Sequence, residues 1–171
     1  MNMSDFAKSL TAIAQHQKPA TFKYFIHAGY LWLGCGAAAV RTVPIEKPVT
    51  DTVLTALGFP GIQEMPDPFA AMSSLDGDEV TQLVLRTNEY IFFNSVHGIS
   101  AFDAKLIAAA DKGKTVESWS MPRAHTLIGW SHTDDPCRIV MACGISDKMA
   151  AGLADAAILL AGGSRQEAEE S

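Results

Sequence analysis

An uncharged stretch from Tyr24 to Val40, between Lys23 and Arg41, constrains this chain more than any other feature. It holds seventeen residues. A transmembrane helix needs roughly 20 predominantly apolar residues, and about 17 at the least. The stretch contains three glycines, and Trp32 lies at its centre, whereas membrane proteins place Trp at the interfacial ends. A membrane-spanning helix is therefore a poor interpretation.

Two short strands joined by a tight turn fit the same stretch better. Its aromatic residues favour strands, and Ala28-Gly29 suits a two-residue turn. Basic residues flank the stretch on both sides, so the charge bias that orients a membrane span is missing. The sequence therefore predicts a hairpin of residues 21–28 and 30–35, in a protein without a membrane span.

Composition sets the class of protein. A chain of 171 residues is long enough for one domain that buries roughly 70% of its unfolded surface. The formal net charge of −6 and the absence of basic clusters argue against nucleic-acid binding, because neutralising phosphates requires a basic patch. The three cysteines show no paired spacing, and the N-terminus has no apolar core of a secretory signal. We therefore expect a cytoplasmic protein of bacterial type.

Four or five helices are expected from capping residues and apolar periodicity. Ser100 with Asp103 three residues later has the pattern of a capping box. The small residues that follow Cys35 can also start a helical turn. The predicted helices begin at the caps Ser4, Thr50, Ser100 and Ser146. The first is stopped by Pro19, the second is closed by Gly58, the third ends at Gly113, and the last spans 146–162, with a further short helical turn over 67–72.

Seven short strands are expected, at 21–28, 30–35, 80–86, 89–94, 114–121, 124–131 and 137–143. The proline-rich stretch 43–68 is interpreted as a connection within one domain, because each flank alone would be small. The predicted fold is a single α+β domain over 1–163, a mainly antiparallel sheet with helices packed against it. Residues 164–171 form a flexible polar tail in this prediction.

A metal site is the first chemical hypothesis. Reactive side chains gather between His125 and Cys143, and the candidate zinc ligands are His125, His132 and Asp135. Their spacing matches no known metal motif, and Cys137 and Cys143 lie too far apart along one strand to share an ion. A solvated turn at 132–136 is the favoured interpretation, and no cofactor is expected.

A cysteine nucleophile is the second chemical hypothesis. Cys143 precedes the predicted helix cap Ser146, and Cys35 follows a strand. His27, His97 or His125 can serve as the base, although the sequence places none of them beside a thiol. The loop 94–98 is a candidate ligand-binding loop between a strand and a capped helix. Buried structural cysteines remain the favoured interpretation.

The predicted function is a non-catalytic protein-interaction module of the inhibitor, immunity-factor, chaperone or adaptor type, which acts by binding another protein. The predicted helix 146–162 is narrow and apolar nearly all round, which suits a homodimer contact. The alternative is a small hydrolase or transferase that uses a Cys/His pair or a metal bound by His and Asp.

Overall fold

The computed structural model describes residues 3–17, 20–45, 51–72, 81–132 and 135–143, together with Gly152 and Asp155. In chain order the elements are α1 Met3–His16, β1 Phe22–His27, β2 Tyr30–Cys35, β3 Ala38–Pro44, α2 Asp51–Ala56, β4 Gln63–Glu64, the 3-10 helix η1 Pro68–Ala71, β5 Gln82–Arg86, β6 Tyr90–Ser95, β7 Gly98–Asp103, α3 Ala104–Ala110, β8 Ser118–Arg123, β9 Thr126–His132 and β10 Asp135–Met141.

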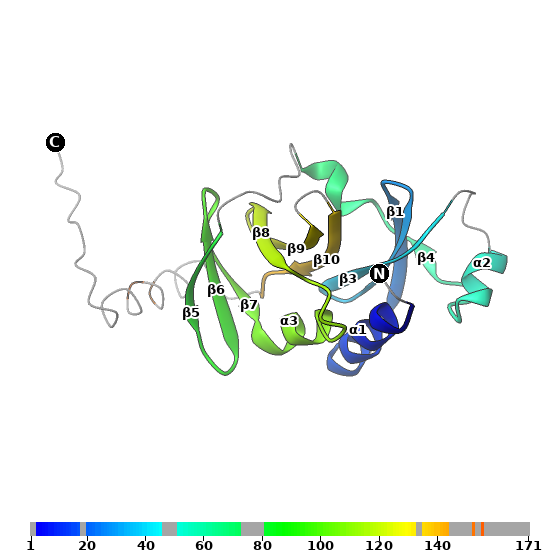
Figure 1. Ribbon diagram of the computed structural model, residues 1–171, viewed down its shortest axis with the longest axis horizontal. Helices are drawn as coiled ribbons and strands as arrows, with labels where there is room; N and C mark the ends of the chain where they lie inside the picture. Colours follow the sequence, from blue (N-terminus) through cyan, green and yellow to red (C-terminus); the bar gives the residue numbers. More distant parts are fainter. Residues whose placement is uncertain are drawn as a thin grey trace.

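The strands form two sheets (Figure 1). The larger has seven strands in the order β4-β1-β2-β3-β10-β9-β8, antiparallel throughout except for the β4–β1 pair. The smaller has three strands in the order β5-β6-β7. The α+β class and the mainly antiparallel sheet expected from the sequence are confirmed, with ten strands in the described residues where seven were predicted in all.

The uncharged stretch 24–40 contains the predicted hairpin. β1 and β2 pair antiparallel, with Phe25 opposite Trp32 and His27 opposite Tyr30. The turn residues Ala28 and Gly29 have φ values of 49° and 77°. Positive φ at both central positions gives the turn the twist that a two-residue hairpin requires. Within the described ranges no helix has the length and apolarity needed to cross a membrane.

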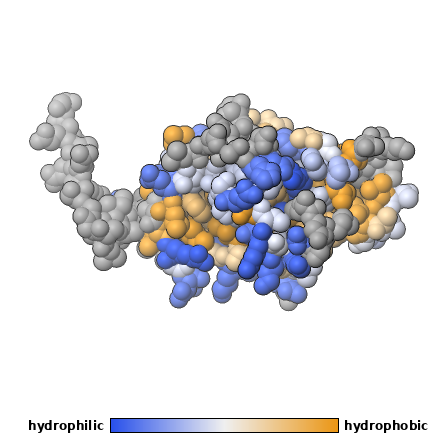
Figure 2. Space-filling model, viewed as in Figure 1, coloured by the Kyte–Doolittle hydropathy of each residue, from blue (hydrophilic) through white to orange (hydrophobic). Residues whose placement is uncertain are grey.

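Helices α1 and α3 cover one face of the larger sheet. Both contact β3, and α3 also packs against β10. Their apolar side chains, such as Ile13 and Leu106, join Cys35, Val40 and Leu127 in one buried cluster. Figure 2 shows hydrophilic side chains gathered over these helices, as expected for amphipathic helices whose apolar stripe faces the sheet. This face is therefore filled.

The opposite face carries a second apolar cluster. Phe25, Trp32, Trp130 and Ile139 project from it, and Phe69 of η1 packs on them. In Figure 1, η1 lies on the side of the sheet away from α1 and α3. The face under α1 and α3 is thus filled, whereas the opposite face is covered only in part. The candidate site described below lies on this partly covered face.

The predicted helix over 100–113 is wrong in its first turn. Residues 98–103 form β7, in which Ser100 pairs with Phe93 of β6, so Ser100 does not cap a helix. Asp103 is the cap, since its carboxylate accepts from the backbone N–H groups of Lys105 at 2.7 Å and Leu106 at 3.1 Å. Pairing with β6 stabilises the extended backbone of residues whose spacing also suits a helix.

The predicted helical turn after Cys35 is also wrong. Gly36 has a φ of +58° and turns the chain into β3, which lies between β2 and β10. The intrinsic helix preference of alanine is weak, and hydrogen bonds to two neighbouring strands override it. The proline-rich connection consequently begins after Pro44 and not at Val43.

Other boundaries differ by a few residues. Helix α1 begins at Met3, so Ser4 lies inside it. The predicted break at Pro122 lies within β8, where the pairing register with β9 is irregular. Gly58 has a φ of +85° and closes α2 as predicted, and η1 confirms the short helical turn over 67–72.

Thr50, the tail 164–171 and all of the predicted helix 146–162 except Gly152 and Asp155 lie outside the described residues.

The carboxyl group of Asp103 makes the stability of the fold depend on pH. His16 Nε2 lies 2.8 Å from its carboxylate. Burial by itself raises the pKa of Asp103, but the hydrogen bonds from His16, Leu106 and Lys105 outweigh burial, so its pKa lies below the ordinary 3.8. A lowered carboxyl pKa stabilises the fold above the ordinary value, and this stability is lost as the pH falls through the folded-state pKa.

We therefore expect Asp103→Ala to lower the free energy of unfolding by about 1 kcal/mol at neutral pH through the lost cap. The control Asp103→Asn keeps a good cap and removes the charge. Denaturant unfolding should show the wild-type advantage over Asp103→Asn shrinking as the pH falls below 3.8, the ordinary value. If the wild type were more stable than Asp103→Asn by the same free energy at neutral and acid pH, the lowered pKa of Asp103 would be contradicted.

Candidate functional site

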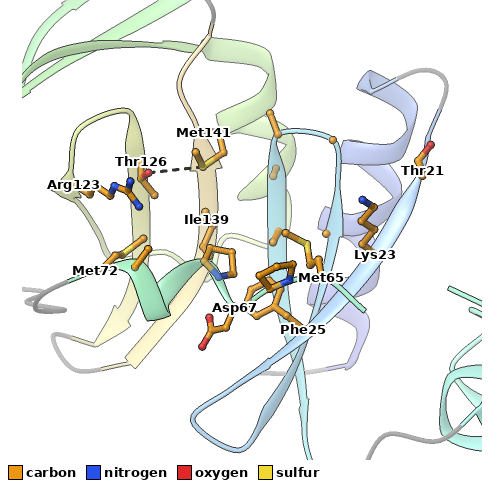
Figure 3. Close-up of a pocket in the computed structure, with 18 residues that line it drawn as sticks. Thr21, Lys23, Phe25, Met65, Asp67, Met72, Arg123, Thr126, Ile139 and Met141 are labelled. Carbon is orange, nitrogen blue, oxygen red and sulfur yellow. Dashed lines mark hydrogen bonds between the residues drawn. The ribbon is translucent and has the colours of Figure 1, made fainter. Parts of the chain in front are cut away.

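A groove of about 720 Å³ opens on the face of the larger sheet that η1 covers only in part (Figure 3). Its volume lies within the roughly 300–1,000 Å³ that is typical of ligand-binding pockets. Its lining comes from β1, β2, β3, β8, β9 and β10, and from residues 65–72. The groove therefore crosses most strands of the sheet.

The hollow results from small residues in the middle of the sheet. Along one row of the register, Lys23 lies opposite Gly34, Gly34 opposite Ala39, and Ala39 opposite Ile139. Gly34 and Ala39 add almost no height to this face. Larger side chains stand on both sides of them, Phe25 on β1 and Ile139 on β10. The floor is consequently lowest where β2 and β3 meet.

Residues 65–72 form one wall and are fixed to β1. The backbone N–H of Met65 donates to the carbonyl of Tyr24 at 2.7 Å. Asp67 accepts from the backbone N–H of Phe69 at 2.9 Å, and its other oxygen lies 2.9 Å from Nδ1 of His27. The His27 ring also stacks on Phe69, with 4.1 Å between the ring centroids. These contacts hold the wall in one position over the sheet.

The lining is mainly apolar and contains three methionines, Met65, Met72 and Met141. Met141 is 41% exposed, and its sulfur accepts from Thr126 Oγ1 at 3.8 Å. Methionine is unbranched and polarisable, so it adapts to partners of different shapes and is favoured at binding surfaces. The groove can therefore accept apolar side chains without requiring a single shape.

Charged side chains lie at two sides of the groove. Figure 3 shows Lys23 on the β1 side and Arg123 on the β8 side. Both are exposed, and neither forms an ion pair with another described residue. β1 and β8 are separated by five strand-to-strand steps, which at about 4.8 Å each amount to about 24 Å. The groove thus has an apolar middle and a cation at each side.

The predicted metal ligands do not meet. His125 lies in the β8–β9 turn and His132 at the far end of β9, roughly 20 Å away along the strand. Asp135 is opposite His132 in the register, but its carboxylate binds the guanidinium of Arg41 and accepts from Ser131 Oγ at 2.8 Å. In the described part of the chain, no three side chains of His, Cys, Asp or Glu gather as a metal site would require.

The three thiols lie in surroundings that favour the neutral form. Cys35 and Cys137 are buried and Cys143 is partly buried. Burial raises the pKa of each thiol above the ordinary 9.0, and the charge of Asp103 raises that of Cys143 further. A catalytic cysteine needs a shift in the opposite direction. The arrangement therefore gives none of the three the electrostatic activation of a nucleophile.

Two of the three predicted histidine bases belong to different turns, and the third, His27, ends β1 with its Nδ1 2.9 Å from the Asp67 carboxylate. The Nδ1 of His125 lies 3.2 Å from the hydroxyl of Ser100. His97 belongs to the two-residue turn between β6 and β7, where its backbone N–H donates to Ser95 Oγ at 3.1 Å. The loop 94–98 thus joins two strands of a hairpin, and the expected connection from a strand to a helix is wrong.

None of the residues that line the groove was predicted as a site residue. The sequence contains one usable signal, the glycine and alanine residues at 34–39 after the large side chains of Tyr30 to Leu33. That signal shows where the surface is low but not what lies beside it.

The chain matches no protein-family model, no curated protein and no solved structure.

The wall formed by residues 65–72 should depend on Asp67. We expect Asp67→Ala to lower the free energy of unfolding by about 1 kcal/mol, because it removes the cap of η1 and the partner of His27. Amide hydrogen exchange over residues 65–72 should become faster. Glu64→Ala is the control, since this exposed carboxylate accepts a hydrogen bond from the Tyr24 hydroxyl at 3.4 Å and lies just before the wall. Equal exchange in both variants would show that Asp67 does not hold the wall.

The thiols should react slowly in the folded protein. With a disulfide reagent at neutral pH, we expect Cys35 and Cys137 to react only on unfolding, because both are buried. The rate for Cys143 should rise only as the pH approaches and passes 9.0, since its pKa is raised. Single Cys→Ser variants assign each phase. A thiol that reacts fully and fast below neutral pH would contradict this description and favour catalysis.

Proposed function

We propose that this chain is a non-catalytic binding protein whose groove takes an apolar segment of another protein. The observation that carries the proposal is the groove itself, about 720 Å³ in volume, floored by Gly34 and Ala39 and lined by three methionines. Concave apolar surfaces of this size are typical of binding sites.

The shape of the floor supports a polypeptide occupant. Because Gly34 and Ala39 have little or no side chain, the main chain of a partner can approach the sheet closely at that point. The methionine lining then adapts to the partner's side chains. The proposal covers inhibitors, immunity factors, chaperones and adaptors, because each of these classes acts by binding another protein.

Catalysis is the weaker alternative. The raised thiol pKa values work against a cysteine nucleophile, and β9 separates His125 from His132. No specific contact in the described residues favours a hydrolase or a transferase. The homodimer through 146–162, the cytoplasmic location and the bacterial source stay predictions.

Filling the groove tests the proposal. A Cβ added at Gly34 would lie 3.6 Å from the Cβ of Ala39 and 3.7 Å from the sulfur of Met65, which are ordinary contacts. Gly34→Ala should therefore fold normally. In Gly34→Leu the rest of the side chain extends into the space that an occupant would use. Circular dichroism and thermal unfolding confirm that each variant is folded before binding is compared.

We expect a stoichiometric partner from a lysate of the source organism to be retained by the wild type and lost by Gly34→Leu. Thr11→Leu is the matched control, since it adds an apolar side chain on the exposed surface of α1. The control should retain the partner fully. Equal capture by a folded Gly34→Leu variant, or no stoichiometric partner with the wild type, would refute the proposal.

A further inference from the structure

We infer that the segment bound in the groove has an apolar centre and an acidic residue on each flank. This inference rests on the proposed function and adds the chemistry of the partner. It is carried by Lys23 and Arg123, the two exposed cations at opposite sides of the groove, neither paired with another described residue (Figure 3).

The chain has a formal net charge of −6, and among its exposed cations that form no ion pair with a described residue, Lys23 and Arg123 are the two that line the groove. An acidic protein repels anions in general, so two unpaired cations at one groove attract negative groups locally and selectively. The two buried arginines of the described residues already bind protein oxygens. Arg41 binds Asp135, and Arg138 donates to backbone and hydroxyl oxygens. Lys23 and Arg123 thus remain available for a ligand.

The middle of the groove disfavours a charged group. Thr126 already donates to the sulfur of Met141, and Asp67 is the acidic residue in the lining. The Asp67 carboxylate accepts from His27 and the backbone of Phe69, so it offers little to a ligand and repels a second carboxylate. The centre of the bound segment should therefore be apolar, with its acidic residues outside Asp67 on both sides.

The spacing of the cations gives the length of the segment. Lys23 and Arg123 belong to strands about 24 Å apart, and an extended chain rises about 3.3 Å per residue. Up to about seven residues therefore separate the two acidic flanks, since the twist of a sheet brings its outer strands closer than the flat spacing. A fatty acid or similar amphiphile carries one anionic head and can satisfy one of the two cations. A polypeptide with an acidic residue at each end can satisfy both.

A displayed library of random peptides provides the test. The baits are the full-length wild type, Lys23→Glu/Arg123→Glu, the groove-filled Gly34→Leu, and the control Lys105→Glu/Lys112→Glu, which reverses two exposed cations elsewhere. We expect the wild type and the control to enrich apolar cores with Asp or Glu on both flanks. Lys23→Glu/Arg123→Glu should lose this preference, and Gly34→Leu should enrich none of these sequences.

Affinities of one enriched peptide make the test quantitative. We expect each single charge reversal, Lys23→Glu or Arg123→Glu, to weaken binding roughly three- to tenfold, and added salt to reduce the difference. The control variant should bind like the wild type. Sodium laurate, tested alongside, should not displace the peptide at concentrations below its critical micelle concentration.

The outcomes separate the two proposals. Two outcomes overturn the inference and still support the proposed function. In the first, the enriched peptides require an open groove but lack acidic flanks. In the second, they bind both charge-reversal variants as well as the wild type. Peptides that bind the folded Gly34→Leu variant equally well overturn both. No enriched peptide also overturns both, and laurate binding that Gly34→Leu abolishes would then assign the groove to an anionic amphiphile.

Discussion

The buried guanidinium of Arg138 organises the helical side of the molecule. The side chain is 0% exposed, and it donates to the carbonyl of Ala110 at 2.6 Å, to Thr115 Oγ1 at 2.8 Å and to Ser9 Oγ at 3.4 Å. Burial lowers the pKa of Arg138, because the charged guanidinium is less well solvated there than in water. A buried charge is tolerated only when its donors are satisfied. β10, α1 and α3 must therefore meet in one arrangement.

Two details show how strictly this arrangement is set. Ala110 is the last residue of α3, and its carbonyl is one of the groups that the helix itself leaves unpaired. Opposite Arg138 in the register lies Gly129, where an added Cβ would come within 2.9 Å of Trp119 and 3.1 Å of the Cβ of Arg138. Arg138 thus satisfies a carbonyl at the C-terminal end of α3, and the missing side chain of Gly129 leaves room for Trp119 and Arg138. One face of the sheet is closed as a result.

The sequence predicted local structure well and long-range structure poorly. The β1–β2 hairpin, α1 and α2 follow from turn residues and apolar spacing within a few positions of each other. β3, β4 and β7 were missed because their stability comes from neighbouring strands, which local spacing does not reveal. Asp103 was recognised as part of a cap but given the wrong place in it. The groove was missed entirely, since Lys23 and Ile139 come to line one surface only through the register of β1, β2, β3 and β10.

Four cations of this protein illustrate two different roles. Arg138 and Arg41 are buried, and their charges serve the fold: the first binds helix and loop oxygens, and the second binds Asp135 and lies 4.5 Å from the centre of the Tyr30 ring. Lys23 and Arg123 are exposed beside an apolar hollow and bind no described carboxylate. Removing exposed, unpaired charges costs a fold little. Their place beside the groove is therefore not explained by the stability of the fold, and it fits the acidic flanks that we propose for the bound segment.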